Sequence, residues 1–274
     1  WSAAINGSHI NSKVTSLYDG QEIIWDDPTG GDSRSQYVYW QGESTLAFYG
    51  REWAGVDPAT GRNLWFSNND NVDFKRDEAD NSTGEKYVID GKNVVYDWSD
   101  ADEVIIGDAH AALYGGFNTD IEWKGLTVGL NFTYKIGGDL YDGAAKDVCD
   151  DGYYWERTRS KFYYDNMWTS THRTGENIQP RISGEDWNDA MRISTRHLYD
   201  ASYLRLATVT VGYTFPKDLV KKAKLSNARV YFNGGNLLTF SKYKLADPVV
   251  NEYGTRGWET PVGKTYTFGI ELSF

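Results

Sequence analysis

The sequence predicts an all-β fold built from the antiparallel strands of a transmembrane barrel. Several segments alternate large apolar residues with small or polar ones, and this period of two places the apolar side chains on one face of a strand. Aromatic residues make up 15% of the 274 residues, a content typical of the interfacial girdles of such barrels. Long polar segments separate the alternating ones, as the long loops on one side of a barrel do.

Composition excludes several other classes of protein. The mean hydropathy is -0.60, and no stretch approaches the ~18 consecutive apolar residues that a membrane-spanning helix requires. The formal net charge of -11 argues against nucleic acid as a partner. Cys149 is the single cysteine, which excludes an internal disulfide and a thiolate metal cage. The chain begins at Trp1 without an initiator Met or a signal peptide, so we expect a fragment of a larger polypeptide.

The first 110 residues predict short strands separated by polar loops. A D-P-A-T-G turn joins two extended pieces between Val56 and Phe66. Residues 67–110 are rich in Asp and Asn, and we expect a long loop there with occasional short strands. The strands expected in this part of the chain lie within 1–18, within 37–56, and near 87–89 and 104–106.

The clearest hairpins follow residue 110. Lys124-Gly125 separates two alternating segments, and the second, 126–136, has about the 9–11 residues that a tilted membrane strand needs. Residues 203–215 and the C-terminal segment 264–274 repeat the pattern. In 203–215, strict alternation puts Tyr203 and Ala207 on the apolar face and Leu204 and Leu206 on the polar face. The residues expected to face lipid are Leu126, Val128, Leu130, Phe132, Val209, Val211, Tyr213, Phe268, Ile270, Leu272 and Phe274.

The connections between these strands differ in length. The short ones, 124–125 and 217–226, lie at one end of the predicted sheet, and the long ones, 138–201 and 241–263, lie at the other. Outer-membrane barrels have short periplasmic turns and long extracellular loops. We therefore expect 138–201 to be a long extracellular loop and the C-terminus to be periplasmic.

Several segments of the chain resemble the SusC/RagA family of TonB-dependent outer-membrane transporters from Bacteroidetes-type bacteria. The resemblance is in collinear order from about residue 54 to residue 274. The matching segments are A-G-V-D-P-A-T-G (54–61), D-F-K (73–75), Y-G-G-F-N-T-D-I-E-W-K-G-L (114–126), G-G-D-L-Y-D (137–142), D-A-S-Y-L-R-L-A-T-V-T-V-G-Y-T-F-P (200–216), G-G-N-L-L-T-F-S-K-Y (234–243), D-P (247–248) and Y-T-F-G-I-E-L-S-F (266–274).

The resemblance implies that residues 1–274 are the C-terminal part of a barrel of about 22 strands, and we expect roughly eight to ten strands in this part. It also implies partners. These are a remaining chain with the plug domain and the first part of the barrel, a SusD-like surface lipoprotein, the TonB complex acting through the missing plug, and an oligosaccharide or peptide substrate. The expected function is nutrient import across the outer membrane.

Two groups of residues are candidates for binding. Trp155, Trp168 and Trp187 in the long loop present aromatic surfaces that suit sugar rings or the lid protein; the alternative is that they anchor the loop to its neighbours. Asp147, Asp150 and Asp151 carry the oxygen ligands that Ca²⁺ accepts, but they lack the spacing of an EF-hand loop. We therefore expect a solvated acidic loop without a metal, and no cofactor.

No catalytic residues are predicted. The four histidines are scattered, and no nucleophile-elbow, Walker or dinucleotide-binding motif occurs in the sequence. Three alternatives to the transporter remain open: a small self-contained porin, a secreted β-sandwich that binds glycans through exposed Trp, and a glycosidase domain, for which carboxylate pairs are too numerous to select from sequence.

Overall fold

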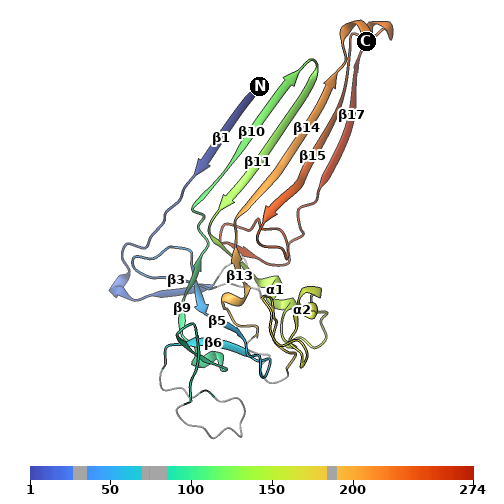
Figure 1. Ribbon diagram of the computed structural model, residues 1–274. Coiled ribbons are helices and arrows are strands. Elements are labelled where there is room, and N and C mark those ends of the chain that lie inside the picture. Colours follow the sequence, from blue (N-terminus) through green and yellow to red (C-terminus); the bar gives the residue numbers. More distant parts are fainter. Residues whose placement is uncertain (27–35, 70–73, 75–84, 184–189) are drawn as a thin grey trace.

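The computed structural model describes residues 1–26, 36–69, 74, 85–183 and 190–274. It consists of a tall twisted sheet, here called the wall sheet, and a body of smaller sheets and short helices at one end of it, here called the loop body (Figure 1). Both termini lie toward the end of the wall sheet that is far from the loop body (Figure 1). No helix in the described part of the chain is long and apolar enough to cross a membrane.

The wall sheet has six strands in the order β1-β10-β11-β14-β15-β17, and every neighbouring pair is antiparallel. Four of them have between 11 and 15 residues, enough to cross a bilayer at a tilt. The bounds are β1 Ser2–Ser8, β10 Leu113–Trp123, β11 Leu126–Ile136, β14 Tyr203–Thr214, β15 Asn227–Ser241 and β17 Thr265–Ser273.

A tight turn joins β10 to β11, as the sequence predicts. Lys124 and Gly125 both have positive φ, 47° and 88°, which is the backbone of a type I′ hairpin turn. β14 and β15 are joined at the same end by the short helix α4, Lys217–Lys222. The wall sheet therefore has its short connections at one end and the loop body at the other (Figure 1).

The register of the wall sheet gives it two chemically distinct faces. Residues directly opposite each other in neighbouring strands share a face. Val128 pairs with Val211, Val211 with Phe232, and Phe232 with Phe268, so one apolar row runs across four strands. The same face contains two ring pairs, Phe117 with Phe132 at 4.4 Å and Phe232 with Phe268 at 5.0 Å between ring centroids.

A β-bulge at Ala207 changes the faces of β14. Asn131 of β11 pairs with Thr208, but the next residue, Phe132, pairs with Leu206. The extra residue reverses the alternation, so that Leu204 and Leu206 share the face of Phe132. The prediction that strict alternation continues through this strand was therefore wrong for its first residues. The sequence did carry a signal for the bulge, because strict alternation counted back from Val209 would put the charged Arg205 on the apolar face, whereas in the structure Arg205 lies opposite Thr133 and pairs with Asp247.

The loop body contains three small sheets with the strand orders β2-β3-β4-β9, β5-β6-β8-β7 and β13-β12-β16. Aromatic residues fill its core: Tyr37 stacks on Trp25 and on Phe48, at 4.5 and 5.0 Å between ring centroids. The strands are β2 Ile23–Asp26, β3 Gln36–Tyr39, β4 Ala47–Arg51, β5 Trp53–Val56, β6 Asn63–Ser67, β7 Tyr87–Ile89, β8 Lys92–Val95, β9 Glu103–Asp108, β12 Asp139–Asp142, β13 Leu198–Asp200 and β16 Thr255–Arg256.

Short helices complete the loop body. They are the α-helices α1 Gly143–Val148 and α2 Lys161–Asn166 and the 3₁₀ turns η1 Tyr18–Gly20, η3 Trp98–Asp100 and η4 Thr195–His197. Asp142 and Ser160 cap α1 and α2 by accepting hydrogen bonds from the backbone N–H groups of Ala145 and Tyr163.

Two expectations need correction. Within the described residues the wall sheet has six strands, not the eight to ten expected from the resemblance, because the strands between β1 and β10 are short and pair in the loop body. The connection 138–201 is also not devoid of regular structure, since it contains β12, α1, α2 and β13. The short strands expected near 87–89 and 104–106 are present as β7 and β9.

Candidate functional site

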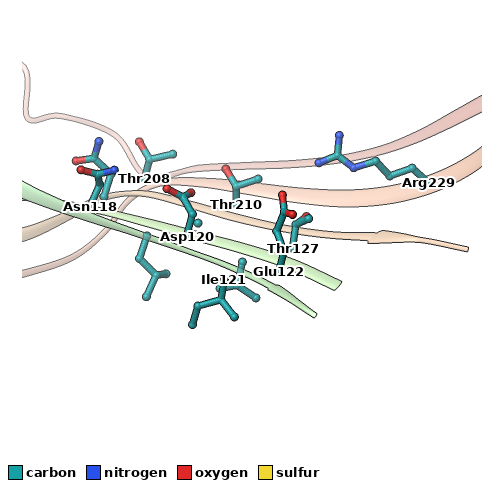
Figure 2. A pocket seen from close by; sticks show the side chains of 12 residues that line it. Asn118, Asp120, Ile121, Glu122, Thr127, Thr208, Thr210 and Arg229 are labelled. Carbon is teal, nitrogen blue, oxygen red and sulfur yellow. The ribbon is translucent and has the colours of Figure 1, made fainter. Parts of the chain in front are cut away.

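The polar face of the wall sheet is hollowed into a cavity of about 430 Å³. Figure 2 shows polar side chains standing on one side of the strands while Ile121 points to the other side. The polar residues that line the cavity are Asn118, Asp120, Glu122, Thr127, Asn131, Thr208, Thr210 and Arg229.

The register of the strands brings these polar groups together. Asp120 of β10 pairs with Gly129 of β11, and Gly129 pairs with Thr210 of β14. A Cβ atom on Gly129 would lie 2.9 Å from Asp120 Oδ1, so glycine leaves room for the carboxylate. At the edge of the cavity, Arg229 Nη1 lies 3.6 Å from the carboxylate oxygen Oε2 of Glu271 in β17.

This face can bind water and hydroxylated or amide-containing solutes, because it offers hydroxyl, amide and carboxylate groups on a rigid sheet. The alternation in the sequence predicted a polar face that carries Thr, Asn, Gly and Lys. The sequence analysis did not single out the charged residues Asp120, Glu122 and Arg229 as candidates for this face, although Asp120 and Glu122 flank Ile121 in the alternating segment.

The residues predicted to face lipid share the opposite side of the wall sheet. The register places Leu126 opposite Tyr213, Leu130 opposite Val209, and Leu272 opposite Ala228. On the edge strand β17, Phe268 and Ile270 are 79% and 70% exposed. Within the described residues no second sheet covers this face, as one would in a β-sandwich. Lipid contact itself stays a prediction.

A buried ion pair ties the loop body together. The two terminal nitrogens of the Arg196 guanidinium, Nη1 and Nη2, donate to the Asp151 carboxylate at 2.6 and 2.7 Å, and both side chains are only 2% exposed. Arg196 Nη2 also donates to the carbonyl of Cys149 and to Gln179 Oε1, while Asn63 Nδ2 of β6 donates to Asp151 Oδ2 at 2.8 Å. Burial opposes the charge of Arg196, but Asp151 outweighs it and raises the pKa of the guanidinium above its usual value.

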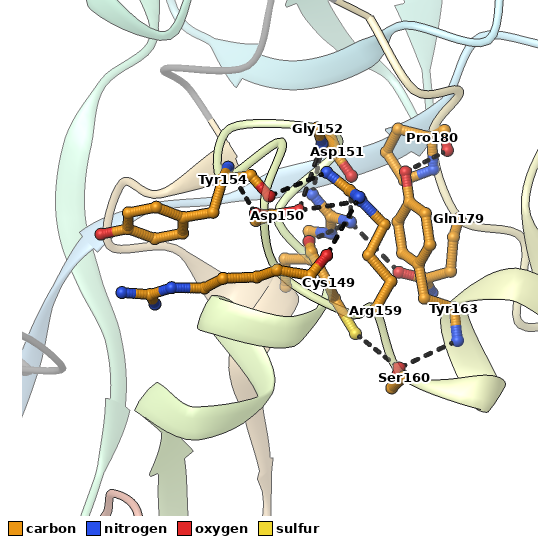
Figure 3. Close-up of polar contacts among 12 residues, drawn as sticks. Cys149, Asp150, Asp151, Gly152, Tyr154, Arg159, Ser160, Tyr163, Gln179 and Pro180 are labelled. Carbon is orange, nitrogen blue, oxygen red and sulfur yellow. Dashed lines mark hydrogen bonds and ion pairs between the residues drawn. The ribbon is translucent and has the colours of Figure 1, made fainter.

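A second carboxylate orders the adjacent turn (Figure 3). Asp150 accepts hydrogen bonds from the backbone N–H groups of Gly152 and Tyr154, at 3.2 and 2.7 Å. The Arg159 guanidinium lies 3.2 Å from the same carboxylate. Tyr163 of α2 is fully buried and donates to the carbonyl of Pro180. Segment 149–180 is therefore held by polar contacts rather than left as an open loop.

The prediction of a solvated acidic loop was wrong. Asp147, Asp150 and Asp151 are 5%, 1% and 2% exposed, and each has a protein partner; Asp147 accepts from the indole of Trp258 at 3.0 Å. Within the ranges that the structure describes, no group of three or more His, Cys, Asp or Glu is arranged to hold a metal ion. Arginine side chains and N–H groups stabilise the negative charge of these buried carboxylates, as a bound cation otherwise would.

The tryptophans predicted to contact substrate or lid, all within 138–201, differ in their structural environment. Trp155 is 82% exposed, and its contact with substrate or lid stays a prediction. Trp168 donates its indole N–H to the carbonyl of Pro58 at 3.1 Å, and a Cβ on Gly61 would lie 2.6 Å from its ring. These are the contacts of an anchor between loop segments. Trp187 lies outside the described residues.

Comparison with known proteins places the chain in a class. The RagAB peptide importer in its "closed-closed" state matches 99% of the chain with a TM-score of 0.68 and 25% identity, and in its "open-open" state with a TM-score of 0.58 and 25% identity. The chain corresponds to 27% and 26% of those matched chains. The mostly β-strand chain thus matches a portion of this importer.

Comparison with known sequences shows which type of receptor the chain resembles. TonB-dependent receptor P3 of Formosa agariphila is 28% identical over 299 residues, which covers 100% of the chain and 27% of the receptor. TonB-dependent receptor P26 of the same organism is 26% identical over 203 residues, or 70% of the chain and 20% of the receptor. No protein-family model matches the chain. The chain is a homologue of TonB-dependent receptors of the RagA/SusC type, and it spans about a quarter of their length.

These relatives are transport proteins rather than enzymes, which confirms the prediction of a non-enzymatic chain. Homology to TonB-dependent receptors implies an outer-membrane location.

Proposed function

We propose that the chain forms the C-terminal wall and loops of an outer-membrane importer of the SusC type. The importer takes up peptides or oligosaccharides together with a SusD-like lipoprotein, and the TonB complex acts through a plug in the remaining part of the polypeptide. The apolar face of the wall sheet contacts lipid, and the polar face lines the lumen of a barrel of about 22 strands.

The observation that carries this proposal is the two-faced wall sheet. Its apolar rows run across neighbouring strands, and its other face holds the polar cavity. In hydrocarbon every backbone N–H and C=O must be paired within the protein, and long antiparallel strands satisfy this when further strands continue the sheet at its edges. The matched RagAB structures support the peptide as one substrate class and a lid protein as a partner.

The face assignment can be tested with a matched pair of cysteine variants in the full-length transporter. Val211→Cys and Thr210→Cys are adjacent in β14 and lie on opposite faces. With a bimane fluorophore attached, we expect brominated lipid to quench position 211 and to spare position 210, while aqueous iodide quenches position 210. Equal quenching of both positions by iodide alone would contradict the proposal.

A second test concerns the orientation of the wall sheet. We propose that the short connections and Phe274 are periplasmic and that 138–201 is extracellular, because outer-membrane barrels have their long loops outside. In intact cells, an impermeant maleimide should label Trp155→Cys, and it should label Lys221→Cys in α4 only after the outer membrane is permeabilised. The reverse pattern would invert the orientation.

A further inference from the structure

A second cavity lies in the loop body, between the region of α1 and the loop that follows β15. Its volume is about 770 Å³, larger than the hollow on the wall sheet. Apolar side chains such as Val148, Phe162 and Leu245 form much of its wall. A cavity of this size matches the usual volume of small-molecule sites.

One charged group in this cavity lacks a suitable partner. Arg256 pairs with Asp142 across the parallel strands β16 and β12, and its side chain is only 11% exposed. Its Nε is buried and has no hydrogen-bond acceptor among the residues that the structure describes. The nearest paired carboxylate oxygen, Asp142 Oδ1, is 4.0 Å away, too far for a hydrogen bond.

Asp142 is already engaged by other donors. Its carboxylate accepts a hydrogen bond from the Tyr243 hydroxyl and another from the Ala145 backbone N–H, at 2.8 Å in the latter case. Burial raises the pKa of Asp142 above its usual value. A guanidinium that is removed from water without a good acceptor is costly, and an anionic ligand would remove that cost.

The rim of the cavity supplies an ordered aromatic surface. The Trp258 indole donates its N–H to Asp147 at 3.0 Å, which fixes the ring, while the side chain remains 65% exposed. Lys244 lines the same cavity and is exposed. The carboxylate of Glu259 accepts from the backbone N–H of Gly257 at 2.8 Å. The cavity therefore offers two cations and an aromatic face, together with the carboxylates of Asp142 and Glu259, which already accept hydrogen bonds from protein donors.

We propose that this cavity is a subsite for a carboxylate-bearing ligand, with the carboxylate on Arg256 and the neighbouring apolar or ring portion against Trp258. The proposal rests on the proposed import function, since it assigns part of the substrate to this cavity. The carboxylate belongs either to a peptide or to an acidic sugar, because both supply the same group.

Isothermal titration with the full-length transporter tests the proposal. The probes are tetraalanine with a free C-terminus, tetraalanine amide and trigalacturonate. We expect binding of at least one free carboxylate probe and a roughly ten- to hundredfold loss of its affinity in Arg256→Gln, with partial recovery in Arg256→Lys, since charge-assisted hydrogen bonds carry this much affinity. If Arg256→Gln lowers the affinity for tetraalanine, the ligand is a peptide. If it lowers the affinity for trigalacturonate, the ligand is an acidic sugar.

Arg173→Gln is the matched control, because Arg173 is an exposed arginine of the loop body that lines neither cavity, and this change should leave the affinity unchanged. Unchanged heat-dependent mobility on gels shows that each variant remains folded. Equal affinity for tetraalanine and its amide together with no effect of Arg256→Gln would overturn the proposal, as would the absence of binding at millimolar probe. The quenching pattern of positions 210 and 211 is independent of this result, so the import function and the subsite can fail separately.

Discussion

Asp151 and Arg196 are 45 residues apart in the sequence and form the best-buried ion pair of the described loop body. A bidentate pair of this kind is retained at a high desolvation cost, and removing one partner leaves the other charged and buried. Its carboxylate also binds Asn63 from β6, so one group joins the second sheet of the loop body to the 149–180 segment. The ordering of this part of the molecule therefore depends on a few polar residues.

We predict that Asp151→Asn destabilises the loop body by about 3–5 kcal/mol, because Arg196 loses its counter-ion. The rate at which a thiol reagent modifies Cys149, which is 4% exposed, measures local opening. The rate should rise by about two to four powers of ten, since each 1.4 kcal/mol corresponds to a factor of ten.

The control for this change is Asp165→Asn. Asp165 forms an exposed pair with Lys161, in which the lysine side chain is 86% exposed. Such pairs contribute little, so Cys149 reactivity should stay within a few-fold of the unmodified protein. Equal rates for Asp151→Asn and Asp165→Asn would show that the buried pair does not hold the loop body.

His197 makes the loop body sensitive to acid. The side chain is 1% exposed, and burial, with the charges of Arg196 and Lys146, lowers its pKa well below 6.5. The unfolded chain binds a proton near pH 6.5 and the folded chain does not, so stability falls as the pH drops below that value, by up to about 1.4 kcal/mol per pH unit. Amide hydrogen exchange of loop-body peptides, corrected for intrinsic rates, should show this loss between about pH 6.5 and pH 5.

The variant His197→Gln removes the titrating group. Its exchange should depend less steeply on pH than that of the unmodified protein. Identical pH dependence of the two proteins would assign the acid sensitivity to other groups.

At the scale of elements, the β10–β11 hairpin shows what local sequence can specify. Gly125 has a φ of 88°, and a Cβ there would lie 2.4 Å from the carbonyl oxygen of Thr214. Gly is the residue that adopts this backbone without strain, and the K-G dipeptide between two alternating segments is sufficient to predict the turn.

We predict that Gly125→Ala destabilises the wall sheet by about 1–3 kcal/mol, through both backbone strain and the close contact. Denaturant unfolding of the full-length barrel in detergent, followed by heat-dependent mobility on gels, measures the change. Gly263→Ala serves as the control, because its Cβ would meet no atom within 4 Å. A shift no larger than that of the control would mean that the turn tolerates a side chain.

The faces of the strands were predictable for most of β11 and β17, since alternation is a property of the backbone alone. They were mispredicted at Leu204 and Leu206, where the bulge at Ala207 adds a residue relative to β11. Whether a bulge forms depends on which partner strand the residue meets, and that partner comes from more than 70 residues earlier in the chain. The candidate cavities were not predictable for the same reason, as Arg256 and Asp142 meet only through β16 and β12.

At the scale of the whole molecule, the wall sheet has two edge strands, β1 and β17. Each presents backbone N–H and C=O groups on its outer side, and such groups are not tolerated in hydrocarbon. Barrels that close on themselves need about eight strands or more. The described chain therefore requires further strands to seal a membrane wall.

We predict that purified residues 1–274 alone do not form a sealed pore in liposomes, because six strands leave both edges open. Dye release should stay at the level of protein-free vesicles, whereas a porin of known size reconstituted in parallel should release the dye. A size-selective leak from the chain alone would favour the self-contained porin.

The sequence by itself determined the all-β character, the two faces of the wall strands and the tight turn, because side-chain direction along a strand and backbone freedom at glycine are local properties. The tertiary structure decided the number of wall strands, the burial of Asp147, Asp150 and Asp151, and the cavity that contains Arg256 and Trp258. Each of these depends on which distant segments become neighbours. A carboxylate in the sequence is the same residue whether it meets water or a buried guanidinium, and only the fold selects between the two.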